Sequence, residues 1–399
     1  MTVDFDISRL DRAFLENPFP IYRALRESDP VHRNADGSYF LTRHADLETA
    51  YKHPAMSSDK RVDFKPNFGD SPLYAHHTTS LVFNDDPYHR RVRKLLAGAF
   101  TPKKLKEIEP RIHAAVDVLL DSLEERGTFD LIEDYALVLP TEIIADMLGV
   151  HPERRPRLRD YSVKILGALD PVISKKTLDA GNAAVEEFGS YLAELIAERR
   201  RHPEAGGQGE VLATLIFGEV DGETLNEEEL IQNCIFLLNA GHETTANLTA
   251  NAICLLMDHP DERRRLLNDP SLIDTCIDEC LRYDSPVQLG NRKAMADIDM
   301  SGVTIPTGSF LHLAIGGANR DPAVFADPER FDIARTPNPH HAFAGGKHIC
   351  LGATLSKIEG RIAVGKFIER FANARYDGVR ERLLRARFRG YARVPVAVR

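Results

Sequence analysis

No uninterrupted apolar run in this 399-residue sequence reaches about 18 residues, the length that a membrane-spanning helix needs. The opening residues MTVDFDISRL lack the basic segment and the apolar core of a secretory signal, so we expect neither a membrane span nor export. Cysteines are few, odd in number and without a CxxC pair: Cys234, Cys254, Cys276, Cys280 and Cys350. This scarcity argues against a disulfide framework and favours a reducing, cytoplasmic location.

An excess of positive charge is also missing. The net charge of −9 disfavours nucleic acid as the main partner, although two short stretches, 89–96 and 386–393, are strongly basic. Local basic stretches within an acidic chain favour a docking or anion-binding surface. With 43% hydrophobic and 28% charged residues the composition is that of a folded protein, and no segment resembles a flexible linker. Length alone allows several domains or one large one.

Helical patterns dominate the chain, with minor strand signals near both ends. Strand signals flank an Ala-Asp-Gly turn within 30–43 and recur at 302–306 and 309–315, and the glycine-containing stretch 58–82 has the composition of a long loop. Apolar residues recur at helical spacing over 105–126, 139–148, 155–169, 177–201 and 271–283, and again after Cys350. The sequence therefore predicts a mainly α protein with minor β structure.

One predicted helix is unusually long. Asn226 can cap it, Glu229 occupies the acidic position of a capping box, and Pro260 ends it after His259. At 1.5 Å per residue its span is roughly 50 Å. Its middle is apolar on nearly every face, so we expect this helix to lie in the centre of the molecule.

The stretch FAGGKHICLG (343–352) sets Cys350 between a glycine-rich turn and a helix start. The unpaired N–H groups of a helix N-terminus lower a thiol pKa. We expect Phe343 to form an aromatic wall, Gly346 to let the backbone approach a large flat group, and Gly352 to let the helix pack against it. This pattern suits an axial thiolate ligand of haem iron. From the residues alone, three other roles for Cys350 stay open: a buried structural cysteine, a nucleophile with His348 as its base, and a zinc ligand.

At this point the sequence resembles a known family, the cytochrome P-450 haem-thiolate monooxygenases of the soluble bacterial type. Five motifs occur in the family's order: DDPYHRRVRKL (85–95), AGHETT (240–245), ECLR (279–282), DPERF (327–331) and the cysteine stretch. The resemblance covers essentially the whole chain. It implies one haem domain over residues 1–399, with a triangular, mainly helical fold around a buried haem b and a long central helix.

The resemblance also implies residue roles. Cys350 is expected to be the iron ligand, and the residues expected to contact haem are His89, Arg93, Ala240, Gly241, Arg292, Phe343, His348 and Gly352. His89 and Arg93 are four residues apart, so they share one helix face and can grip the haem propionates together with Arg292 and His348. Glu279 and Arg282, with Arg330 as a third member, are expected to form a structural ion network.

Thr244 and Glu243 are the expected catalytic residues. The threonine hydroxyl is expected to hydrogen-bond dioxygen, and the carboxylate to relay protons from solvent. Gly241, which costs about 1 kcal/mol in a helix interior, suggests a local widening of the helix where a small molecule binds. A threonine that only bonds back to its own helix is the structural alternative.

The implied reaction inserts one oxygen atom of O2 into a small, largely apolar organic substrate. Expected substrate contacts lie at 64–74, Phe236, Leu237, 287–289 and Tyr391. Lys60, Arg61 and Lys65 either anchor a carboxylate or are solvated loop charges.

Two electrons must come from outside, because no flavin, NAD(P) or iron–sulfur region is present. We expect an acidic ferredoxin to dock on a monomer near Cys350, at Arg90, Arg91, Lys94, Lys347 and Lys357. A peroxide-driven peroxygenase, a haem sensor without turnover and a haem-free thiol hydrolase are the competing hypotheses.

Overall fold

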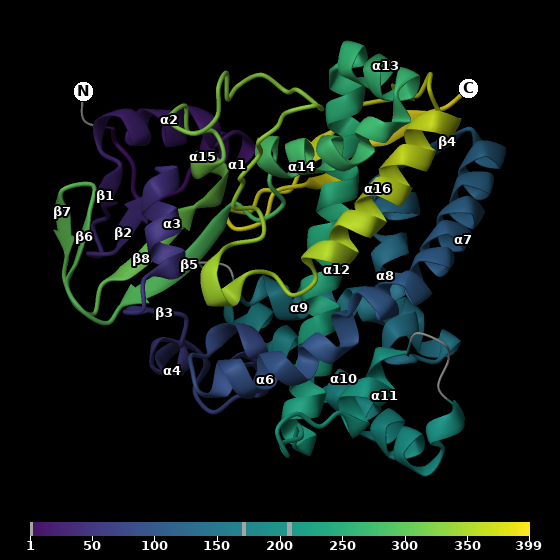
Figure 1. Cartoon of the computed structure of the whole chain (residues 1–399), viewed down its shortest axis with the longest axis horizontal. Coiled ribbons are helices and arrows are strands. Elements are labelled where there is room, and N and C mark those ends of the chain that lie inside the picture. Colours follow the sequence, from purple (N-terminus) through teal and green to yellow (C-terminus); the bar gives the residue numbers. More distant parts are fainter. Residues whose placement is uncertain (1–2, 170–172, 206–209) are drawn as a thin grey trace.

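The computed structural model describes residues 3–169, 173–205 and 210–399, and helices form most of it. The long helix α12 (Glu227–Asp258) runs through the middle of the molecule (Figure 1). It packs against α8 (Val138–Leu148), α9 (Leu158–Gly167), α10 (Lys175–Arg201), α14 (Ile273–Tyr283) and α16 (Ala353–Arg370). α16 packs in turn against α7 (Pro102–Arg126). These helices confirm the predicted ones to within a few residues at each end.

The start of α12 has the predicted capping box. The Asn226 side chain accepts a hydrogen bond from the Glu229 N–H at 2.9 Å, and the Asn226 N–H donates to the Glu229 carboxylate at 3.0 Å. The helix then continues without a break to Asp258, with His259 as its C-cap. Most of its side chains are buried because other helices cover it on several sides. Among the described residues, no helix is both long and apolar enough to cross a membrane.

The main sheet contains five strands in the order β1 (Val31–Arg33), β2 (Tyr39–Leu41), β8 (Phe310–Ala314), β5 (Leu289–Ala294) and β3 (Met56–Ser57). β1 and β2 form the predicted hairpin, with Val31 opposite Leu41. β8 pairs parallel to β2 and antiparallel to β5. On one face Leu311 and Leu313 pack with Tyr51 of α3 (His44–Lys52); on the other, Phe40 packs with Tyr22 of α2 (Phe19–Ser28). The sheet is therefore covered on both faces, to one side of the helical part (Figure 1).

Shorter elements complete the described chain. The remaining helices are α1 (Arg12–Glu16), α4 (Arg61–Phe68), α5 (Pro72–Thr79), α6 (Tyr88–Ala97), α11 (Val211–Phe217), α13 (Pro260–Asn268) and α15 (Ile315–Ala318). β4 (Thr128–Asp130), β12 (Pro395–Ala397) and β9 (Arg375–Tyr376) form one small sheet. β6 (Ile298–Met300) pairs with β7 (Val303–Ile305), and β10 (Glu381–Arg382) pairs with β11 (Tyr391–Arg393).

The prediction of a long loop over 58–82 is wrong, because α4 and α5 occupy most of it. Ser71 caps α5 by accepting a bond from the Tyr74 N–H, and Pro72 stands at the first helical position, where a missing N–H costs nothing. The aromatic rings of α4 pack together, with Phe64 and Phe68 centred 5.3 Å apart. Gly69 ends α4 and Pro72 begins α5, so these two residues mark helix ends rather than an irregular loop.

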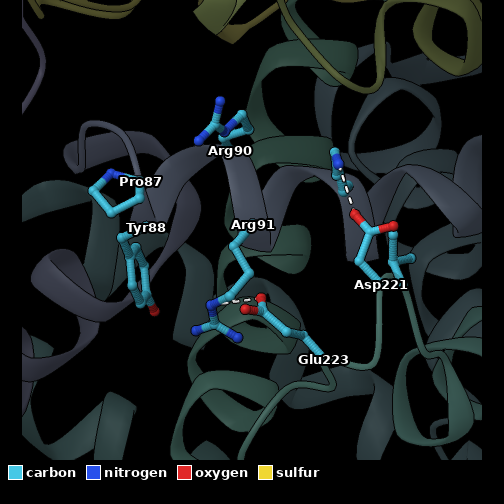
Figure 2. Close-up of a pocket in the computed structure, with 8 residues that line it drawn as sticks. Pro87, Tyr88, Arg90, Arg91, Asp221 and Glu223 are labelled. Atoms are coloured by element: carbon cyan, nitrogen blue, oxygen red, sulfur yellow. Dashed lines mark hydrogen bonds and ion pairs between the residues drawn. The ribbon is translucent and has the colours of Figure 1, made fainter.

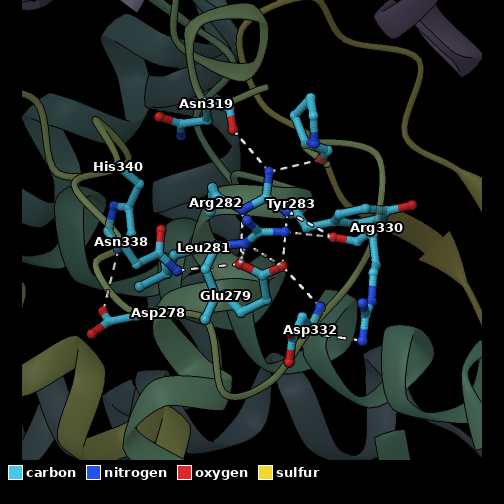
Figure 3. Close-up of polar contacts among 12 residues, drawn as sticks. Asp278, Glu279, Leu281, Arg282, Tyr283, Asn319, Arg330, Asp332, Asn338 and His340 are labelled. Atoms are coloured by element: carbon cyan, nitrogen blue, oxygen red, sulfur yellow. Dashed lines mark hydrogen bonds and ion pairs between the residues drawn. The ribbon is translucent and has the colours of Figure 1, made fainter. Parts of the chain in front are cut away.

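A fully buried ion pair within α14, between Glu279 and Arg282, also binds the segment that precedes the cysteine loop (Figure 3). Arg282 donates to both Glu279 oxygens, at 2.7 and 2.8 Å. It also donates to the carbonyls of Asn319, Pro328 and Arg330, at 3.0, 2.9 and 3.2 Å. All these acceptors satisfy a guanidinium that would be costly to bury without partners.

The third member of this network is not the predicted Arg330. A turn from Asp327 to Arg330 directs the Arg330 carbonyl inward, so its side chain points outward and is 63% exposed. Arg335, 11% exposed, takes the expected place, with its Nε 3.1 Å from Glu279. Asn338 also donates to Glu279, at 3.2 Å. The network thus fixes the chain from 328 to 338 on α14, just before the cysteine stretch.

Arg335→Ala should lower the free energy of unfolding by about 2 kcal/mol, because Glu279 would keep Arg282 but lose its second guanidinium. Arg330→Ala, which keeps the backbone carbonyl that Arg282 uses, should change it by less than about 0.5 kcal/mol. Urea denaturation of both variants measures the difference. Equal losses would contradict the assignment of Arg335 to the network.

Candidate functional site

Cys350 lies in the tight loop that precedes α16. Its N–H donates to the Phe343 carbonyl at 3.0 Å, and Gly352 is the N-cap of the helix. Gly346 has φ +62°, and a Cβ there would stand 2.1 Å from the Tyr51 carbonyl oxygen. This glycine therefore permits close contact with the backbone of α3. A Cβ on Gly352 would meet no described protein atom within 4 Å, so its expected packing against a flat group stays a prediction.

The Cys350 thiol is exposed, whereas the other four cysteines are buried. Protein atoms still surround it closely enough that burial raises the pKa of Cys350, against the lowering effects of the Gly352 N–H and the Arg93 charge. The expected lowering by the helix end is real but too weak, because α16 begins only at Ala353. The sulfur is thus open to a ligand, but it is not a thiolate of its own accord.

Neither zinc nor a nucleophile fits this cysteine. In the described part of the chain, no group of three or more His, Cys, Asp or Glu side chains is arranged to hold a metal ion. The His348 ring lies against the His89 ring, with centres 3.9 Å apart, and its Nε2 is 3.7 Å from Asp85. A nucleophilic thiol needs a lowered pKa and a histidine base aimed at it. Cys350 has a raised pKa, and its neighbouring histidine is directed elsewhere.

Helix α6 brings basic side chains to the cysteine loop. His89 is buried, and neither ring nitrogen has a hydrogen-bond partner among the described residues. Burial lowers the pKa of His89 to about 4, and the charges of His348 and Arg93 act in the same direction. Burial also lowers the pKa of Arg93, and its interaction with Cys350 partly offsets this effect. The i, i+4 spacing thus places both residues of α6 at the loop, as predicted.

Arg292 reaches the same region from β5. It is buried over the Tyr51 ring, 5.2 Å from the ring centre, and its Nη2 lacks a hydrogen-bond partner among the described residues. The His348 Nε2 likewise has none, and the charge of Arg292 helps to lower the pKa of His348 after burial itself. A buried donor without a partner costs about 1–3 kcal/mol. Several such donors beside one cysteine fit a dianionic group such as the two haem propionates.

The oxygen-side motif lies on α12, but its local structure differs from the prediction. A Cβ on Gly241 would approach Ile144 of α8 to 2.8 Å, so this glycine allows two helices to pack closely. The predicted local widening is wrong, because α12 continues regularly through this point. The Thr244 hydroxyl donates to the Ala240 carbonyl at 2.7 Å. This bond to its own helix is the one expected if the threonine has only a structural role. Ala240 itself is exposed.

Glu243 has a partner that sequence analysis missed. Its carboxylate is buried and 2.6 Å from the Arg385 guanidinium, which also donates to the Leu166 carbonyl at 3.2 Å. Arg385 therefore joins α12, α9 and the C-terminal segment. No motif or spacing links positions 243 and 385, which are 142 residues apart.

The residues predicted to contact or anchor the substrate differ in how exposed they are. Arg61 and Lys65 are exposed and paired with Asp59 and Asp70, so they are surface charges. Lys60, in contrast, is fully buried. Tyr391 is packed beneath the Arg382 guanidinium, 3.8 Å from its ring centre. Leu237 is buried and Phe236 half-buried on α12, and Val287 forms an isolated bridge with Phe388.

A surface groove of about 440 Å³ lies beside α6 and is lined in part by Arg90, Arg91 and Lys94 (Figure 2). Lys94 pairs with Asp221 at 2.8 Å, and Arg91 pairs with Glu223 at 3.7 Å and more closely with Glu229. Acidic side chains thus neutralise two of the three expected docking cations that line this groove. Arg90 is exposed and makes no ion pair with any described residue.

Comparison with known proteins agrees with this geometry. The family model for Cytochrome P450 matches residues 36–384. A biotin biosynthesis cytochrome P450 of Bacillus subtilis (strain 168) is 37% identical over 363 residues, covering 90% of each chain. The vitamin D(3) 25-hydroxylase of Pseudonocardia autotrophica is 38% identical over 392 residues, covering 96% of this chain and 94% of the other.

Among solved structures, P450BioI in complex with hexadec-9Z-enoic acid ligated acyl carrier protein superposes with a TM-score of 0.91. It is 33% identical, and the match covers 97% of this chain and 100% of the other. The chain belongs to the cytochrome P450 family and has its fold. Members of this family are haem-thiolate monooxygenases, and this chain is an enzyme of that class.

Proposed function

We propose that Cys350 is the axial ligand of haem b and that the enzyme uses O2 to oxidise a small, largely apolar organic substrate. The observation that carries this proposal is an open sulfur beside Arg93, in the same region as buried donors on His89, His348 and Arg292. Haem bound there supplies the iron at which dioxygen is reduced. We infer that the four basic residues hold its propionates, and that Ala240, Gly241, Phe343 and Gly352 line it.

The raised pKa of Cys350 agrees with this role. A metal ion deprotonates a coordinating thiol outright, so the loop need not stabilise a free thiolate. What the loop contributes is position: the Cys350 N–H is tied to Phe343, and the network around Glu279 fixes the preceding segment.

Thr244 and Glu243 are the residues to which we assign proton delivery. The Thr244 hydroxyl has its hydrogen directed to the Ala240 carbonyl, so its oxygen remains able to accept a proton and pass one on. Glu243 is one residue away, and Arg385 holds its carboxylate in place and balances its charge. The pair on α12 favours an enzyme that uses O2 over a peroxygenase, because peroxide already carries its protons and electrons.

An apolar substrate is supported by the named ligands of two relatives, hexadec-9Z-enoic acid and vitamin D(3). The single domain over 1–399, the monomeric state and the cytoplasmic location remain predictions. Electrons are expected from an external ferredoxin and its reductase. Arg90, which is exposed, is the docking cation that we retain first, since Lys94, Arg91 and Lys357 have close acidic partners. Lys347 is also exposed, but it lies 3.8 Å from Asp85 and 3.9 Å from Asp86.

Cys350→Ser should abolish the strongly red-shifted absorbance band of the reduced carbon monoxide complex, because the band would depend on a thiolate ligand that a serine oxygen does not supply. The wild-type protein, reconstituted with haem, should show the band. Cys234→Ser, at a buried cysteine on the same α12 helix as Thr244, is the control that should retain it. A wild-type protein without the band would overturn the proposed function.

Thr244→Ala should uncouple the reaction: NAD(P)H consumption continues while product formed per NAD(P)H falls several-fold, because the hydroxyl that passes protons is lost. Thr244→Ser keeps the hydroxyl and should retain the coupling. The assay uses ferredoxin, its reductase and a substrate identified by the low-to-high-spin absorbance change. Unchanged coupling in the alanine variant would favour the peroxygenase hypothesis or the purely structural role.

Arg90→Glu should raise the apparent KM for ferredoxin several-fold at low salt, with a smaller effect at high salt, because screening weakens interactions between exposed charges. Arg264→Glu provides the matched control, since this exposed arginine lies on α13, at the far end of the molecule from α6 (Figure 1). An equal effect from both variants would reflect net charge alone and reject docking at Arg90.

A further inference from the structure

Lys60 is a buried charge that the proposed function does not explain. Its side chain is 1% exposed, and its Nζ makes no hydrogen bond with any described residue. The nearest carboxylate oxygen, on Asp63, is 3.7 Å away, and the ring centre of Phe310 is 4.6 Å away. An ammonium group without hydrogen-bond acceptors is among the most costly groups to bury.

The surroundings of Lys60 are positively charged. One oxygen of Asp63 accepts from Lys293 at 2.6 Å, and the other, which faces Lys60, makes no hydrogen bond with any described residue. Burial lowers the pKa of Lys60 to about 8, and the charges of Arg292, Arg387 and Lys293 act in the same direction. Lys60 thus shares one carboxylate with Lys293, in a region where other basic side chains also act on it.

Strand geometry separates Lys60 from the donors assigned to haem. Successive side chains of a strand point to opposite faces of the sheet. Arg292 is opposite Leu311 and lies over Tyr51, on the α3 face. Lys293 is opposite Phe310, and Lys60 contacts the Phe310 ring, so both lysines lie on the other face. Lys60 and Lys293 are thus separated by the sheet from Arg292, which is assigned to haem.

Arg387 connects this cluster with the oxygen-side motif. Its carbonyl accepts from the Gln288 N–H at 2.8 Å, and its guanidinium is 3.5 Å from the Leu289 carbonyl. Both contacts lie within 287–289, a predicted substrate-contact segment. Two residues earlier in the chain, Arg385 holds Glu243 beside Thr244. The segment 385–388 therefore connects the region of Lys60 with Glu243 and Thr244 on α12.

We propose that Lys60, assisted by Arg387, binds the carboxylate head group of an amphiphilic organic acid whose apolar body extends toward Thr244. This proposal rests on the proposed function and names its class of substrate. A carboxylate supplies the hydrogen-bond acceptor that the Lys60 ammonium lacks. Arg61 and Lys65, the other cations of this region, already have acidic partners on the surface.

The test compares dodecanoic acid with dodecan-1-ol, which differ only in the head group. Calorimetry and the low-to-high-spin absorbance change measure both affinities on the haem-loaded enzyme. The wild type should bind the acid at least about tenfold tighter than the alcohol, and Lys60→Met should lose at least about tenfold for the acid while the alcohol stays within twofold. Lys65→Met, on the same helix but exposed and paired, should retain the preference for the acid.

Three further readouts keep the proposal falsifiable. The thermal midpoint of ligand-free Lys60→Met should not fall, because methionine removes a buried charge without a hydrogen-bond partner; a fall would show a structural role and overturn the proposal. A loss of haem or of the carbon monoxide band in this variant would assign Lys60 to a propionate instead, with the same consequence. No preference for the acid in the wild type would also overturn it. Absence of the band in the wild type is a separate failure, of the proposed function, and calorimetry still measures the head-group preference.

Discussion

The fully buried pair of Glu279 and Arg282 is the interaction on which the haem side of this molecule depends. A guanidinium and a carboxylate with no access to water must find every partner inside the protein, and here the partners are backbone carbonyls and side chains between 319 and 338. Because these hydrogen bonds must all be made inside the protein, they fix the position of the segment before the cysteine on α14. Such a pair contributes geometry more than net stability.

A second constraint is charge that the protein does not balance by itself. Donors on His89, His348 and Arg292 gather near Cys350, and on the other face of β5 the ammonium of Lys60 lies among cations. Buried donors without acceptors, and a buried cation above all, are unfavourable unless an anion joins them. The two faces of one strand thus indicate two anionic ligands, a cofactor with acidic groups and a substrate with one.

Helix α12 shows how a motif can be found correctly while its residues act for other reasons. The sequence AGHETT marks the right turn of the right helix, yet Gly241 is needed by Ile144 of a neighbouring helix, and Thr244 bonds to its own backbone. Glu243 is held by an arginine near the C-terminus. Helix packing and long-range pairing decided these details, and a motif of six residues contains no information about either.

By itself, the sequence determined the local features: the capping box at Asn226, the ends of α12, the hairpin near residue 36, and the class of protein, because these depend on neighbouring residues or on motifs in a set order. Only the tertiary structure decided that Arg335 rather than Arg330 meets Glu279, that 58–82 is helical, and that Lys60 is buried while Lys65 is not. The physical reason is that burial and ion pairing join residues far apart in the chain. Which of several similar side chains points inward depends on turns and packing, and residue spacing does not specify these.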